Sequence, residues 1–102
     1  MSYKCISVAQ AEELLKIEGS VLLDIRDLAS FSIGNIAGAI HLTNENIEQI
    51  IESSDKSKPF IIYCYHGNSS KGVADYFFRR GFENSCSVDG GYQEWAGQHS
   101  NR

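Results

Sequence analysis

A cysteine followed by a loop of small and polar residues is the part of this sequence with the clearest chemistry. Cys64 ends an apolar run that begins at Phe60, and Tyr65 to Ser70 lead into an amphipathic segment. This order predicts a strand, a loop and a helix, with loop N–H groups curled around the sulfur as in an anion site. A cysteine titrates at about 8.5, and lower beside a helix N-terminus. We therefore expect Cys64 to be a thiolate nucleophile in an anion pocket.

The alternative for Cys64 is a buried structural thiol. The glycine and the small polar residues that follow it favour a loop that exposes its backbone, and hence a reactive cysteine. Cys5 and Cys86 lie in apparent strands without such loops, so we expect both to be buried structural thiols. Three widely spaced cysteines form no disulfide framework, which indicates a reducing compartment.

Charged residues gather at the end of a second apolar run, Val21 to Ile25. Asp24, Arg26 and Asp27 lie where parallel strands present their carboxyl ends, and there ligands collect. One interpretation makes Arg26 an anion contact. The other makes the three residues an ion-pair lattice that fixes nearby loops, and we favour it because charges near a core survive by pairing.

The hydrophobic pattern predicts an α/β fold whose five strands alternate with helices around a mainly parallel sheet. Ser7 and Gln10 form a capping box for the first helix, and Gly81 closes the helix after the Cys64 loop. The expected strands are 5–6, 21–25, 39–42, 60–64 and 86–88. Two of the expected helices are 8–17 and 27–33. A third is capped by Thr43 and has Ile47, Ile50 and Ile51 facing inward. A fourth follows the Cys64 loop, and Tyr92 and Trp95 open the last. Gly90 and Gly91 allow a close backbone approach at the pocket rim.

Composition limits the possible partners. The 102 residues suit one domain, 1–102, and the net charge of −4 with a pI near 5.2 does not favour nucleic acid or an anionic membrane. No apolar run approaches the ~20 residues of a membrane span, and the first residues lead into no signal-peptide core, so a cytoplasmic protein is expected.

His41 has no second His or Cys at metal spacing, and we expect it to be a hydrogen-bonded structural residue rather than a metal ligand or base.

Four stretches in order resemble the rhodanese family, and most closely its small single-domain bacterial thiosulfate sulfurtransferases. They are 64–70, 23–27, 34–40 and 88–92 with Trp95, and the resemblance covers 7–96. The chain departs from the family pattern because its loop carries no Arg or Lys. Asn35 also stands where His is common, and Ala37 where Pro is common.

The resemblance implies a three-layer rhodanese-like fold and sulfur transfer from thiosulfate to cyanide or a dithiol through a Cys64 persulfide, with release of sulfite. It needs no cofactor or metal, and it assigns anion binding to the loop residues Tyr65, His66, Gly67, Asn68, Ser69 and Ser70. A cysteine phosphatase or arsenate reductase would need Arg at position 70, which is Ser. A catalytically silent binding module and a carrier of another protein's persulfide remain alternatives, as do a monomer and a weak dimer.

Overall fold

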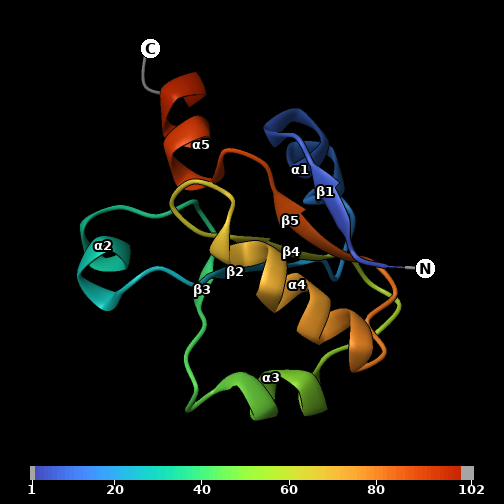
Figure 1. Ribbon diagram of the computed structural model, residues 1–102. Coiled ribbons are helices and arrows are strands. Elements are labelled where there is room, and N and C mark those ends of the chain that lie inside the picture. Colours follow the sequence, from blue (N-terminus) through green and yellow to red (C-terminus); the bar gives the residue numbers. More distant parts are fainter. Residues whose placement is uncertain (1, 100–102) are drawn as a thin grey trace.

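Strand β4 (Phe60–Tyr63) is the central strand of a five-stranded parallel sheet in the computed structural model, which describes residues 2–99 (Figure 1). All strand pairs are parallel, so the predicted α/β class and the five-stranded parallel sheet are confirmed. The sheet order is β1 (Lys4–Ile6), β5 (Ser85–Val88), β4, β2 (Val21–Asp24) and β3 (Ile40–His41).

Helices cover both faces of this sheet. They are α1 (Val8–Leu14), α2 (Leu28–Ile33), α3 (Ile47–Ser53), α4 (Ser69–Arg79) and α5 (Gly91–His99). Figure 1 shows α1 and α5 on one side of the sheet and α3 and α4 on the other, while α2 follows the carboxyl end of β2. None of the helices in residues 2–99 has the length and apolar character to cross a membrane.

Strand β4 joins two hydrophobic cores. Ile61 and Tyr63 pack with the residues of α1 and α5, whereas Phe60 and Ile62 pack with those of α3 and α4. All four side chains are fully buried, as the unbroken apolar run predicts. Burial of each such side chain stabilises the fold by about 1.5 to 3 kcal/mol. The carboxyl end of β4, where Cys64 follows, is therefore held rigidly.

Two helix ends differ from the sequence prediction, and the first is that of α1, which ends at Leu14 and not at Ile17 because the chain turns after the C-cap Leu15. The Ser7 capping box is present, and Gly81 adopts a φ of 100° just beyond the C-cap of α4. The second is the start of α3. The sequence predicted Thr43 as its N-cap, and this prediction is wrong because Asn46 occupies the N-cap position. The Thr43 hydroxyl accepts hydrogen bonds from the next turn, at Glu45 and Asn46, before the helix starts.

Candidate active site

Cys64 lies just beyond β4, with only 6% of its surface exposed. Its Sγ accepts hydrogen bonds from the backbone amides of Gly67 at 3.1 Å and Ser70 at 3.3 Å. The Ser70 amide belongs to the first turn of α4, so the helix N-terminus faces the sulfur. The loop thus has the inward-facing amides that its composition predicts.

Two serine hydroxyls extend this set of donors. Ser70 Oγ lies 3.4 Å from Cys64 Sγ and 2.7 Å from Ser87 Oγ on β5, and both serines are fully buried. A thiolate accepts hydrogen bonds only, so the Ser70 hydroxyl donates to it. Ser70 then accepts from Ser87, and the three groups form one chain that ends on the sulfur.

These donors determine the charge state of the sulfur. Burial by itself raises the pKa of the Cys64 thiol. Hydrogen bonds from the Ser70 hydroxyl and from the backbone amides of Ser70, Gly67 and His66 outweigh burial, and the pKa lies below that of an ordinary cysteine. The pocket therefore favours the thiolate through uncharged hydrogen-bond donors.

Replacing Ser70 with alanine is expected to raise the pKa of Cys64, because the thiolate loses its hydroxyl donor. Since a raised pKa leaves less thiolate at neutral pH, the alkylation rate should fall about three- to tenfold, and its pH profile should move to higher pH. Alkylation by iodoacetamide as a function of pH measures this. Ser69→Ala is the matched control because the Ser69 side chain is exposed, and an unchanged profile in Ser70→Ala would contradict the account.

The N-terminus of α5 holds the loop in this conformation. Tyr92 N donates to Cys64 O at 2.7 Å and Gln93 N donates to Tyr65 O at 3.1 Å. These first-turn amides have no partner within their own helix, so the loop carbonyls satisfy them. A trans peptide points its C=O and N–H in opposite directions, and the carbonyl of Tyr65 therefore turns the amide of His66 toward the sulfur.

Glycine is required where α5 meets the loop. Gly91 has a φ of +60°, and a Cβ at this position would lie 2.4 Å from Cys64 O and 2.6 Å from Tyr65 O. No side chain fits so close to a backbone, and only glycine adopts positive φ without strain. The close backbone approach that the two glycines predict is confirmed at Gly91.

Arg26 is a buried ion-pair partner, not a free cation. Its side chain is 2% exposed, and its guanidinium binds both carboxylate oxygens of Asp24, with Nη2 at 2.7 Å from Oδ2. Burial lowers the pKa of Arg26, but the hydrogen bond and charge of Asp24 outweigh burial and raise it. Nη2 also donates to Gly34 O at 2.6 Å, and the guanidinium carbon lies over the ring of Tyr92, 4.0 Å from the ring centroid. The predicted ion pair is therefore present for two of the three charged residues.

Asp27 departs from the predicted ion-pair lattice. Its carboxylate caps α2 by accepting hydrogen bonds from the Ser30 amide at 3.0 Å and the Ser30 hydroxyl at 2.8 Å, and the Ser30 hydrogen bonds lower its pKa. A short acidic residue before a helix satisfies free amides more readily than it reaches a buried guanidinium. The cap signal was present in the sequence, and the ion-pair interpretation overlooked it.

A cavity of about 270 Å³ opens above Cys64. Its walls come from the loop, from the segment after β2 and from the start of α4. The lining residues are Ile25, Arg26, Asp27, Cys64, Tyr65, His66, Asn68 and Ser69. The Tyr65 hydroxyl pairs with the Ser30 hydroxyl of α2, while the His66 side chain is exposed. The volume of this cavity beside the sulfur is large enough for a small molecule.

Comparison of the whole chain with known proteins identifies its family. A family model of the rhodanese-like domain matches residues 7–98. The chain belongs to this family. A rhodanese-related protein from Thermoplasma volcanium has 26% identity over 95% of this chain and 94% of that chain, with a TM-score of 0.79. A human single-domain sulfurtransferase has the same fold, at 15% identity over 93% and 96% of the two chains, with a TM-score of 0.75.

Another rhodanese-fold neighbour bears a different description. A protein of unknown function from Rhodopseudomonas palustris, described as a possible tyrosine phosphatase, has 24% identity over 94% of this chain and 81% of that chain, with a TM-score of 0.78. Identity at this level shows the fold alone. The choice between sulfur and phosphoryl chemistry therefore depends on the side chains around Cys64.

Ser87 is a residue of this rhodanese-like domain whose place in the site was not predicted from the sequence. Ser85 and Ser87 flank Cys86 on β5, so their side chains face the same side of the sheet. Ser85 Oγ donates to Ala74 O at 2.8 Å, and Ser87 Oγ pairs with Ser70 Oγ. Two hydroxyls at alternating positions of a buried strand were a detectable signal, because buried polar groups need nearby partners.

The other two cysteines differ from each other. Cys86 is buried, as predicted, and burial raises the pKa of its thiol. Cys5 is exposed, so its prediction as a buried thiol was wrong. Strand β1 forms an edge of the sheet, and only Ile6 of its three residues is buried. Within residues 2–99, the His, Cys, Asp and Glu side chains form no cluster of three that would hold a metal ion.

The buried pair gives a prediction for stability. Asp24→Ala should lower the free energy of unfolding by about 3 to 5 kcal/mol, because it leaves the guanidinium of Arg26 buried and unpaired. Asp27→Ala removes only a helix cap and should cost about 0.5 to 2 kcal/mol. Urea unfolding of both variants measures the difference. Equal costs would show that the buried pair contributes no more than the cap.

Proposed function

We propose that this rhodanese-like domain is a thiosulfate sulfurtransferase that carries sulfane sulfur as a Cys64 persulfide. The observation that supports the proposal best is the set of donors on Cys64 Sγ, which comprises the amides of Gly67 and Ser70 and the Ser70 hydroxyl. Donors that are fixed before the reaction stabilise negative charge without reorganisation. These donors stabilise the negative charge of the thiolate before the transfer and that of the persulfide after it.

The first half-reaction loads the enzyme. The Cys64 thiolate attacks the outer sulfur of thiosulfate, the S–S bond of thiosulfate breaks, and sulfite leaves with the bonding electron pair. The loop amides and the N-terminus of α4 bind the anion in the cavity of about 270 Å³. Arg26 contributes no free charge, because Asp24 neutralises it. Backbone groups thus take the role that a basic residue has in many relatives.

The second half-reaction discharges the enzyme. An acceptor such as cyanide or a thiol attacks the outer sulfur of the persulfide, the bond to Cys64 Sγ breaks, and its electron pair returns to the sulfur as thiolate. No proton has to move in the transfer to cyanide. The donors around Sγ stabilise the leaving thiolate, so one set of hydrogen bonds serves both steps.

Phosphatase activity is the competing proposal. Phosphate ester cleavage at a cysteine needs a guanidinium that clamps the equatorial oxygens, and position 70 offers one hydroxyl in its place. The guanidinium of Arg26, which lines the cavity, is committed to Asp24 and Gly34. We therefore expect no appreciable hydrolysis of aryl phosphates by this chain.

Two assays on one preparation test the proposal. We expect sulfite release from thiosulfate and thiocyanate formation when cyanide is added, together with background rates on p-nitrophenyl phosphate. Cys64-dependent release of phosphate would favour the phosphatase. The absence of turnover in both assays would favour a silent binding module.

A further inference from the structure

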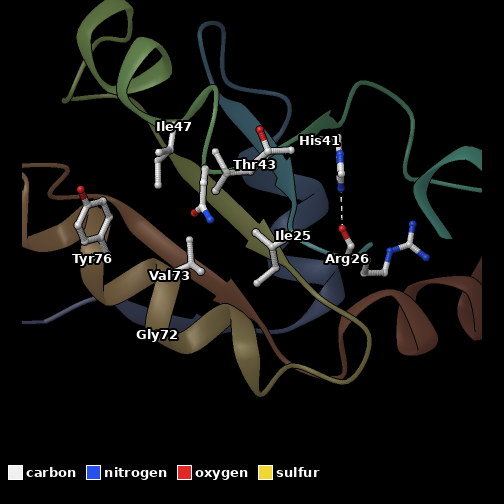
Figure 2. Close-up of a pocket in the computed structure, with 10 residues that line it drawn as sticks. Ile25, Arg26, His41, Thr43, Ile47, Gly72, Val73 and Tyr76 are labelled. Carbon is white, nitrogen blue, oxygen red and sulfur yellow. Dashed lines mark hydrogen bonds between the residues drawn. The ribbon is translucent and has the colours of Figure 1, made fainter. Parts of the chain in front are cut away.

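A second hollow adjoins the pocket at Cys64. It is a groove of about 670 Å³ between α4 and the segments around β3 and α3 (Figure 2). Ile25 and Arg26 line both the groove and the smaller cavity above the sulfur, so the two spaces share a wall. The surface of the groove is mostly apolar. Its apolar side chains are Ile25, Leu42, Ile47, Val73 and Tyr76.

A glycine of α4, Gly72, lines this groove. Gly72 is the fourth residue of α4, and a Cβ added there would meet no atom within 4 Å. Glycine within a helix is less stable than alanine, and here no close contact requires it. Gly72 has no positive φ either. Because Gly72 is exposed and lines the groove, a long side chain at this position has room to extend over the groove without a backbone clash.

The groove contains little charge. Arg26 is the one lining residue that is permanently charged, and Figure 2 shows its guanidinium turned away from the other labelled side chains. His41 Nε2 forms a hydrogen bond with Arg26 O at 2.6 Å, which confirms the predicted structural hydrogen bond of this histidine (Figure 2). An apolar concave surface with a few polar groups at the rim is typical of sites for small molecules, which have volumes of about 300 to 1,000 Å³.

We propose that this groove binds the apolar body of the sulfur acceptor, a small thiol with an alkyl chain, and directs its sulfur past Ile25 to Cys64. The inference rests on the proposed sulfur transfer. In the step it assists, the acceptor thiolate attacks the outer persulfide sulfur, the bond to Cys64 Sγ breaks, and the electron pair returns to Cys64. The products are the Cys64 thiolate and the persulfide of the acceptor.

A pair of mercaptoalcohols tests the groove. Enzyme loaded with thiosulfate is mixed with 2-mercaptoethanol or 6-mercapto-1-hexanol, and discharge is followed under single-turnover conditions. At equal subsaturating thiolate concentrations we expect the longer thiol to react at least about tenfold faster, because its four additional methylenes bury apolar surface in the groove. Equal rates in the wild type would overturn the proposal.

Gly72→Leu supplies the blocking variant. We expect it to reduce the preference for the longer thiol to less than about threefold, with loading by thiosulfate and discharge by cyanide close to the wild type. Gly97→Leu is the matched control, since Gly97 lies within α5, a Cβ there also meets nothing, and the residue does not line the groove. Asn44→Phe, from an exposed position on the rim, is a second block if Gly72→Leu folds poorly.

The outcomes separate the two proposals. The groove proposal would be overturned if the preference for the longer thiol survived both blocking variants, or if it fell equally in Gly97→Leu. Either result would leave the proposed sulfur transfer intact. A wild-type enzyme that does not load from thiosulfate would overturn the proposed function itself. Binding of 1-hexanol to the unloaded protein, followed by the chemical shifts of Val73 and Tyr76, tests the groove independently of turnover and should disappear in Gly72→Leu.

Discussion

Cys64→Ser is expected to lower sulfite release from thiosulfate by at least about a thousandfold, which is the scale of loss for a removed nucleophile. A serine hydroxyl keeps a similar shape, but it is not ionised near neutral pH and cannot carry sulfane sulfur as a persulfide. The amides of Gly67 and Ser70 would then face an oxygen that forms no covalent intermediate. Steady-state assays with thiosulfate and cyanide measure the loss.

Cys5→Ser is the control for this substitution. Cys5 is exposed on edge strand β1, so its replacement should leave turnover and folding nearly unchanged. A strong loss in Cys5→Ser with the fold preserved would show that a second cysteine takes part in sulfur transfer. Substantial activity in Cys64→Ser would contradict the assignment of the nucleophile.

Gly67→Val is expected to reduce the persulfide-forming rate by about a hundredfold or more, since small misplacements of reacting groups have effects of this size. Gly67 has a φ of +93°, and a Cβ there would lie 2.8 Å from Gly90 N and 3.1 Å from Val88 O. A β-branched residue would be strained by about 1 to 3 kcal/mol and would push the loop away from β5. The Gly67 amide, which donates to the sulfur, would move with it.

His66→Ala provides the comparison within the same loop. The His66 side chain is exposed, and only its backbone amide reaches the sulfur, so its loss should change the rate by less than about threefold. Circular dichroism of both variants establishes whether the sheet is intact. Equal damage in His66→Ala and Gly67→Val would mean that the imidazole takes part in binding or proton transfer.

Local patterns in the sequence predicted the parts of the fold that depend on one element. The unbroken apolar run of β4 indicated burial on both faces, and the capping box at Ser7 located α1. The exposure of Cys5 was not predictable from its strand pattern, because it depends on β1 lying at the edge of the sheet. Edge positions follow from the strand order, which a local window does not contain.

The candidate site divides in the same way. The loop that carries Cys64 was recognisable because its small polar residues are consecutive. The support it receives from the amides of Tyr92 and Gln93 was not, because nothing in those side chains marks their backbone as a donor to residues 64 and 65. Ser87 joined the site through the pairing of β4 with β5, which brings its hydroxyl to Ser70.

The mass of the intact protein after incubation with thiosulfate tests the central claim most directly. We expect the addition of one sulfur atom per chain, its loss on treatment with cyanide, and no addition in Cys64→Ser. Cys5→Ser should gain the sulfur as the wild type does. An unchanged mass in the wild type, or a sulfur that is retained in Cys64→Ser, would contradict a persulfide on Cys64.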